Sequence, residues 1–249
     1  MTIVTNAPTF QRRLLAWYRR HGRRLPWRDT RDPYKVLVSE IMLQQTQVDR
    51  VVPKYHEFLR KFPTVRALAK ARPAEVRKTW YPLGYNIRPY RLHSIARESV
   101  AKYGGRIPDR HEDLLAMDGI GRYTAGAVMT FAHGKPAPIL DTNVARVLAR
   151  VFYGYRGSVG DLRARTPYAR QGDAGSLGAR RGGARPRPPL FRDLWALSDQ
   201  LLQRAPRAGY DFNQALMDLG AQVCTARAPA CPRCPVRRVC KAYPWRATS

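Results

Sequence analysis

The chain has few acidic residues, no cysteine before residue 224 and no long apolar run. All four cysteines lie in the last 26 residues, so a fold stapled throughout by disulfides is excluded. No segment approaches the roughly 20 consecutive apolar residues of a membrane-spanning helix, and the N-terminus lacks the apolar core of a signal peptide. We therefore expect an intracellular protein, in the cytoplasm or nucleoid, with no membrane partner.

Positive charge is what the sequence has in excess. Lysine and arginine number 45 against 18 aspartates and glutamates, and the formal net charge is +27 at pH 7. Solubility needs far less charge, so the composition indicates a polyanionic partner, with nucleic acid first and a membrane surface as the competitor. A length of 249 residues allows one sizeable core or two small ones.

Helical periodicity dominates the chain. Apolar residues recur at spacings of three and four in "FQRRLLAWY", "YHEFLRKF", "VRALAKA" and "LWALSDQLL", with Pro and Gly between these segments. No series of alternating strands appears, which predicts an all-α fold. Residues 155–189 interrupt this pattern with Gly, Arg and Pro, and we predict a disordered insertion there, either an inert loop or a basic arm that follows phosphates.

The stretch "DGIGRYTAG" at residues 118–126 predicts a helix-hairpin-helix over residues 113–132. Gly119 and Gly121 let the backbone approach a ligand closely, and the N-terminus of the second helix offers free N–H donors to a DNA phosphate. An ordinary tight turn is the alternative.

Two carboxylates stand at unusual positions. Glu40 lies inside "YKVLVSEIMLQQTQV", where apolar groups surround the helix, so we expect it to be buried with a raised pKa suited to general acid catalysis. A structural glutamate bonded to an arginine is the alternative. Asp141 precedes the amphipathic "TNVARVLARV" and is either a helix N-cap or an anion that stabilises a cationic sugar. The amide side chains that follow Glu40 could form hydrogen bonds with the edges of DNA bases, or they could simply lie in solvent at the end of the helix.

The four cysteines follow the spacing Cys224-x6-Cys231-x2-Cys234-x5-Cys240. A two-residue gap is common in zinc sites, but only the middle pair has it. Four clustered thiolates also hold [4Fe–4S] clusters. The spacing leaves zinc, iron–sulfur and unliganded thiols open.

Taken together, these motifs resemble the helix-hairpin-helix (HhH-GPD) DNA glycosylases, and within them the MutY-type adenine DNA glycosylases. The resemblance runs from about Phe10 to Cys240. It rests on the cysteine spacing and on six motifs, "LPWR", "SEIMLQQTQV", "LGY", "GIGRYTAG", "ILDTNV" and "FNQALMDLGAQVC".

The resemblance implies two helical domains that flank a DNA-binding groove. One is a six-helix barrel at residues 23–135. The other combines residues 1–22 with 136–249 and carries a [4Fe–4S] cluster on a loop at residues 224–240. The expected substrate is double-stranded DNA with a mismatched or damaged base pair, bound by a monomer.

Roles for individual residues follow from the same resemblance. Glu40 corresponds to the acid that protonates a flipped purine, and Asp141 to the carboxylate that stabilises the oxocarbenium-like sugar. The other DNA contacts implied are Gln45 and Tyr85 in the base stack, Arg28 and Gln214 beside the flipped adenine, and Asn143 near Asp141. Without the resemblance, Tyr85 reads as core, Gln214 as an exposed helix amide, Arg28 as a phosphate or salt-bridge partner and Asn143 as a first-turn cap.

Tyr123 occupies the position where bifunctional relatives carry the lysine that forms a Schiff base. The tyrosine implies a monofunctional enzyme that leaves an abasic site for a downstream endonuclease, and we expect Tyr123 to tune the transition state near Asp141. The alternative for Tyr123 is a phenol that merely caps the hairpin.

The chain also departs from the adenine branch. Nine residues follow Cys240, so we expect the additional domain that reads 8-oxoguanine to be missing. The short thymine/uracil glycosylases share this architecture and are the principal alternative, followed by a non-catalytic mismatch-binding protein. Gln44 and Gln45 favour the adenine branch.

Overall fold

A computed structural model describes residues 6–84, 87–164 and 189–245. Helices and turns make up this described part, which contains no β-strand, so the predicted all-α fold is confirmed. The chain divides into a central unit, Arg24–Ala137, and a terminal unit that joins Met1–Arg23 to Pro138–Ser249. Among the described helices, none has the length and apolar character needed to cross a membrane.

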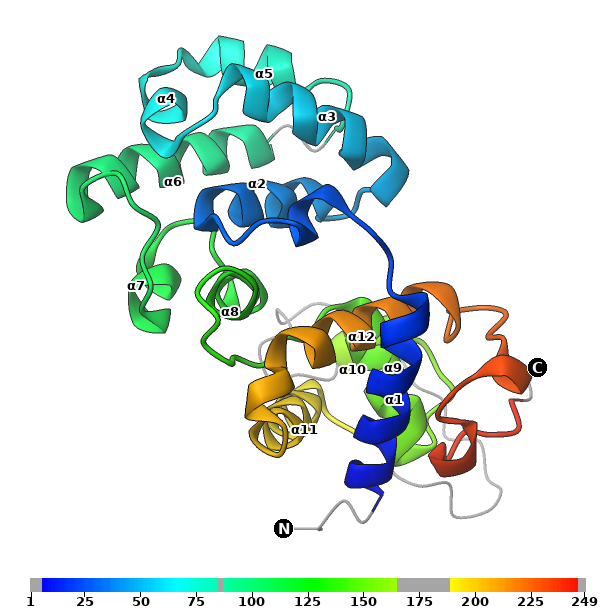
Figure 1. Ribbon diagram of the computed structural model, residues 1–249. Helices are drawn as coiled ribbons and strands as arrows, with labels where there is room; N and C mark the ends of the chain where they lie inside the picture. Colours follow the sequence, from blue (N-terminus) through cyan, green and yellow to red (C-terminus); the bar gives the residue numbers. More distant parts are fainter. Residues whose placement is uncertain (1–5, 85–86, 165–188, 246–249) are drawn as a thin grey trace. The chain divides into compact units, whose positions relative to one another are not determined.

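The central unit is built around a buried helix (Figure 1). In chain order its elements are η1 (Pro26–Arg28), α2 (Pro33–Leu43), α3 (Val48–Lys61), α4 (Val65–Lys70), α5 (Pro73–Trp80), α6 (Ile87–Tyr103), α7 (His111–Ala116) and α8 (Arg122–Phe131). Helix α2 contacts α3, α6 and α8, which explains why apolar residues occur all round it. The Asp32 side chain caps its start by accepting the Tyr34 N–H, next to a proline at the first helical position.

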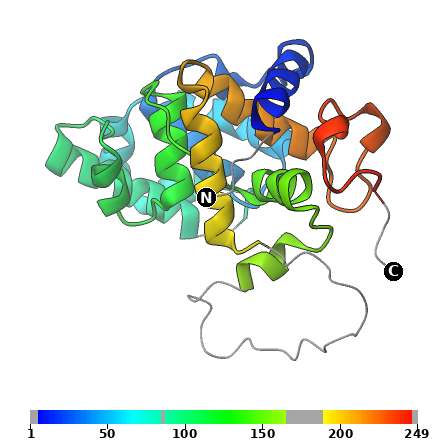
Figure 2. The same ribbon diagram turned by 90° about the horizontal axis from the view of Figure 1, so that it is seen from below.

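The terminal unit packs around α12, which contacts both α1 and α9 (Figures 1 and 2). Its elements are α1 (Ala7–His21), α9 (Thr142–Tyr153), α10 (Val159–Ala164), α11 (Phe191–Gln203), η2 (Pro206–Ala208), α12 (Gly209–Gln222), η3 (Cys231–Arg233) and η4 (Arg237–Val239). Phe10 joins α1 to the core, with ring centroids 5.0 Å from Phe152 and 6.4 Å from Phe212. Arg23 donates to the fully buried Asp218 of α12 from its backbone and its side chain.

Part of the segment 155–189 forms a helix. Val159–Ala164 form α10, with Val159 and Leu162 buried, so the expected disorder is wrong for these residues (Figure 2). The short apolar pair was overlooked because Gly and Arg surround it. Residues 165–188, which hold the rest of the predicted insertion, lie outside the described residues.

Candidate functional site

Glu40 stands in the middle of α2 and is 4% exposed. The flanking side chains Val36, Leu37, Ile41 and Met42 are all almost fully buried, because neighbouring helices cover every side of α2. The expected burial of Glu40 is therefore present, in a site where an ionised carboxylate loses most of its water.

Asp141 is the N-cap of α9. Its Oδ1 accepts the Val144 N–H at 2.7 Å, and its Oδ2 accepts the Asn143 side-chain amide at 3.1 Å. Burial raises the pKa of Asp141, while these two hydrogen bonds act in the opposite direction. The predicted alternative, that Asp141 is a helix N-cap, is therefore correct. The same two donors stabilise the charge of its carboxylate in a poorly solvated position.

A line of hydrogen bonds leads from Asp141 to the end of α12. Asn143 Oδ1 accepts from Arg146 Nη2 at 2.8 Å. The same guanidinium donates to the Gly220 carbonyl at 2.8 Å and to the Cys224 carbonyl at 2.7 Å. Arg146 is 8% exposed, so its charge is fixed in place and ties the start of α9 to the first cysteine.

The predicted hairpin lies between α7 and α8. Gly119 has φ +90°, a conformation that favours glycine, and Gly121 is the extended N-cap residue of α8. A Cβ at Gly121 would meet no atom within 4 Å, so the backbone N–H groups of α8 begin at an open surface. Tyr123 is half-buried in the first turn of α8.

The remaining predicted DNA contacts occupy several elements. Gln45 is exposed after the end of α2, and Arg28 is half-buried in η1. Gln214 is only 3% exposed on α12, so reading it as an exposed helix amide is wrong. Within the described residues its Oε1 accepts no hydrogen bond, which is unusual for a buried amide. Tyr85 lies outside the described residues.

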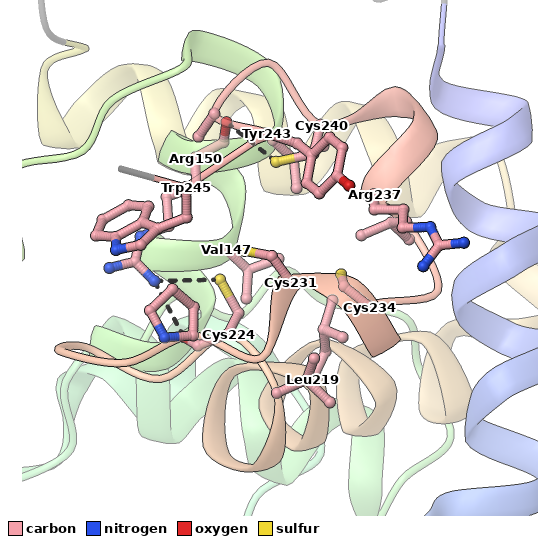
Figure 3. Close-up of a pocket in the computed structure, with 15 residues that line it drawn as sticks. Val147, Arg150, Leu219, Cys224, Cys231, Cys234, Arg237, Cys240, Tyr243 and Trp245 are labelled. Carbon is pink, nitrogen blue, oxygen red and sulfur yellow. Dashed lines mark hydrogen bonds between the residues drawn. The ribbon is translucent and has the colours of Figure 1, made fainter. Parts of the chain in front are cut away.

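The four cysteines surround one cavity in the terminal unit (Figure 3). All four are unpaired and half-buried. Burial raises the pKa of Cys234 to about 12 and also raises the pKa of Cys231 and Cys240. Within the described residues no three His, Cys, Asp or Glu side chains are grouped as a single metal ion would require. The thiols line a common space rather than one point.

Arg150 closes one side of this cavity (Figure 3). Its Nη1 lies 3.4 Å from the Cys224 sulfur and donates to the Thr225 carbonyl, and its guanidinium stacks 3.9 Å from the centre of the Trp245 ring. Sequence reasoning missed Arg146 and Arg150. Their signal was their spacing of four on one face of α9, which placed both on the buried side of the helix.

The structure brings some of the predicted residues together within each unit. In the terminal unit Asp141 and Asn143 are linked through Arg146 to Cys224, the first of the four cysteines. Glu40, Gln45, Arg28 and the hairpin belong to the central unit.

Known proteins resemble this chain in sequence and in fold. Residues 38–158 match the family described as the HhH-GPD superfamily base excision DNA repair protein. A thymine-DNA glycosylase of Aeropyrum pernix is 37% identical over 94% of this chain and 93% of its own length. A solved thermostable thymine-DNA glycosylase superposes with a TM-score of 0.77 at 30% identity, covering 96% of each chain.

Human adenine DNA glycosylase is 40% identical over 96% of this chain. The match spans only 40% of the human protein, so the two chains differ greatly in length.

Proposed function

The chain belongs to the HhH-GPD superfamily of base excision DNA repair proteins, and we propose that it is a monofunctional adenine DNA glycosylase. That it is a DNA N-glycosylase, as the sequence predicted, is confirmed by this membership and by its glycosylase relatives. The proposed reaction hydrolyses the N-glycosidic bond of a flipped adenine opposite G or 8-oxoguanine and leaves an abasic site.

The observation that carries the proposal is the geometry of Asp141. Loss of a purine develops positive charge on the sugar, as in other glycoside hydrolyses. A carboxylate in a poorly solvated position, held by the Val144 N–H and the Asn143 amide, stabilises that charge more strongly than a solvated one. The two donors also fix the carboxylate, so little reorganisation is needed when the charge appears.

Glu40 supplies the proton in this proposal. Adenine leaves readily only after its N7 is protonated, and a carboxylic acid inside an apolar helix is suited to hold that proton. Tyr123 in α8 lacks the amine that a Schiff base requires, which favours hydrolysis without strand cleavage.

The other DNA contacts follow from the family. Gln45 and Tyr85 enter the base stack, and Arg28 and Gln214 lie beside the extruded base. Gly119 and Gly121 place the start of α8 against a phosphate. The buried Gln214 Oε1 supports this assignment, because a base amino group would supply the hydrogen bond that it lacks within the described residues.

Cys224, Cys231, Cys234 and Cys240 would hold a [4Fe–4S] cluster, which stabilises the loop and takes no part in hydrolysis. In such a cluster each thiolate binds a different iron, whereas zinc draws its ligands to one centre. Thiols that surround a cavity without grouping at one point fit the cluster better. A brown protein with iron in place of zinc would support this assignment; a colourless protein with one zinc would contradict it.

A thymine/uracil glycosylase acting on T·G or U·G is the second candidate. One specific observation favours it: a thymine-DNA glycosylase is 37% identical over 94% of this chain, and a solved thymine-DNA glycosylase superposes with a TM-score of 0.77. Against it stands the pair Gln44–Gln45, the motif that favoured adenine.

Single-turnover base release tests these alternatives. The duplexes carry A opposite 8-oxoguanine, A opposite G, T opposite G or U opposite G, and alkali then reveals abasic sites. Release of adenine supports the proposal, and release of T or U alone supports the second candidate. Asp141→Asn should slow release by about 100-fold or more while DNA affinity remains. A protein that binds mismatches without releasing any base would be a binding protein only.

The remaining parts of the proposal concern the cellular setting. A monofunctional product is an uncut abasic site, so an abasic-site endonuclease must act next. We place the protein, as a monomer, on chromosomal DNA in the cytoplasm or nucleoid.

A further inference from the structure

Arg88, in the first turn of α6, is a buried cation that the proposed reaction does not use. It is 3% exposed. Its Nη1 lies 3.1 Å from the Ile41 carbonyl, 2.8 Å from that of Met42 and 2.5 Å from that of Gln44. These three carbonyls end α2, so the guanidinium occupies the negative end of that helix.

The second nitrogen of the same guanidinium reaches two further segments. Nη2 donates to Thr46 Oγ1 at 3.0 Å and to the carbonyls of Leu83 and Gly84 at 3.1 and 3.2 Å. The guanidinium lies 5.4 Å from the centre of the Trp80 ring. One planar side chain therefore fixes the end of α2 to the turn before α6.

Gln45 lies between the two residues that Arg88 contacts in this loop. Its φ is +56°, and it is the single non-glycine residue with positive φ among those described. Such a conformation costs about 1 kcal/mol or more for a residue with a side chain. It persists only where neighbouring contacts hold it, and here Gln44 and Thr46 are both held by Arg88.

This backbone conformation leaves the Gln45 side chain exposed at the end of an otherwise buried helix. A side chain that enters a base stack must be presented in this way, without the freedom to fold back. Any stacked residue also has to stay in place while the extruded base leaves the duplex.

We propose that Arg88 is a positioning residue: it holds the loop 44–46 so that Gln45 stands ready to enter DNA. The inference rests on the proposed function, because it assumes that Gln45 contacts the base stack. Arg88 itself is buried and acts through Gln45.

A double-mutant cycle tests this coupling. The variants are Arg88→Lys, Gln45→Ala and the two combined, with Arg97→Lys as the matched control on the exposed face of α6. Lysine keeps the charge but cannot reach several acceptors in a plane. The first readout is single-turnover base release. The second, in an Asp141→Asn background, is the fluorescence of a 2-aminopurine placed next to the mismatch, which rises when the base unstacks.

We expect Arg88→Lys to slow base release by about tenfold or more and to reduce the fluorescence rise. In the Gln45→Ala background the same change should add less than about twofold, because the residue it positions is already gone. Arg97→Lys should change neither readout. Equal effects of Arg88→Lys in both backgrounds would overturn the proposal, since a purely structural role does not depend on Gln45.

Two further points keep the test decisive. If Arg88→Lys fails to fold, Thr46→Val removes one acceptor with little change in shape and should show the same dependence on Gln45; additive effects of Thr46→Val then count against the proposal. If the wild-type protein releases no base from any duplex, it is the proposed function that fails. If it releases base but the cycle is additive, only the inference about Arg88 fails.

Discussion

Asp141 combines a structural and a chemical role in one side chain. As the N-cap of α9 it satisfies the Val144 N–H, and the same fixed oxygen atoms form the proposed anion for the sugar. Burial raises the pKa of Asp141, because its ionised carboxylate is less stable in the folded protein than in water. The chemical role can therefore be tested by the pH dependence of base release, and the structural role by the free energy of unfolding.

The first prediction concerns the pH dependence of base release. The Asn143 amide lowers the pKa of Asp141, so Asn143→Ala should raise that pKa further. In the proposed reaction the ionised form of Asp141 is the active one, so base release should fall as pH drops through its pKa. The acid limb of the pH–rate profile should therefore move to higher pH by about one pH unit. An equal loss of rate at every pH would show that Asn143 does not act through the charge of Asp141.

The second prediction concerns stability. A raised folded-state pKa means that the folded protein holds the Asp141 proton more tightly than the unfolded chain, whose carboxyl has the ordinary value of 3.8. The ionised group therefore costs stability above its folded-state pKa, and this cost disappears below about pH 4. Asparagine caps helices equally well. Asp141→Asn should raise the free energy of unfolding at pH 7 by about 1 kcal/mol.

The measurement is denaturant unfolding at pH values from about 4.5, just above the ordinary carboxyl pKa, to about 7.5. The gain should shrink as pH falls. A variant less stable than the wild type at pH 7 would mean that the carboxylate is a net stabilising group.

Sequence patterns located some of these residues and not others. Burial of Glu40 followed from apolar neighbours on all sides, and the place of Asp141 before an amphipathic helix predicted the N-cap. Arg88, Arg146 and Arg150 were not identified, because an arginine becomes buried only when carbonyls from distant segments surround it. That arrangement is tertiary, and the one local sign of it was the spacing of four that places Arg146 and Arg150 on the buried face of α9.

Between elements, the approach of α12 to α9 depends on a glycine. A Cβ at Gly220 would lie 2.6 Å from Asn143 Cβ and 3.0 Å from the Asn143 carbonyl oxygen. The two helices are therefore in backbone contact at the residue that orients Asp141.

Gly220→Ala should accordingly separate α9 from α12. We expect a decrease of about 1 to 3 kcal/mol in the free energy of unfolding, together with slower base release, because Asn143 moves with the backbone. Gly160→Ala in α10 is the matched control, since its Cβ would meet only Ser158 Oγ at 3.3 Å. Urea unfolding and single-turnover kinetics of both variants check this. Gly220→Ala with wild-type stability would mean that the helices shift apart at no cost.

Helices with strong periodicity were the elements best anticipated. The segments at α1, α3, α4 and α11 follow the predicted three-and-four spacing. Helix α10 was missed because Val159 and Leu162, the buried residues among the described side chains at 159–162, are too few to reveal a period.

At the scale of the whole chain, charge is the dominant property. The net charge of +27 is what remains after all 18 acidic residues are set against the 45 lysines and arginines. Residues 165–188 carry six arginines and one aspartate. We infer from this composition that the segment contributes to DNA binding, as the arm hypothesis states.

The final prediction tests this contribution of residues 165–188 by changing their charge. Replacing the six arginines between residues 165 and 188 with serine should weaken binding to undamaged duplex. The slope of log K against log salt should become shallower by about 0.9 for each phosphate that the variant no longer neutralises, up to about 5 in total. A variant with the same residues in shuffled order keeps the charge and should bind like the wild type, because counterion release does not depend on sequence.

Fluorescence anisotropy titrations from 50 to 200 mM salt, about the range over which phosphate binding weakens most visibly, measure both variants. Unchanged slopes for the serine variant would assign the segment to an inert loop. Weaker binding by the shuffled variant would point to recognition by particular side chains, because the two chains carry the same charge and differ only in the order of their residues.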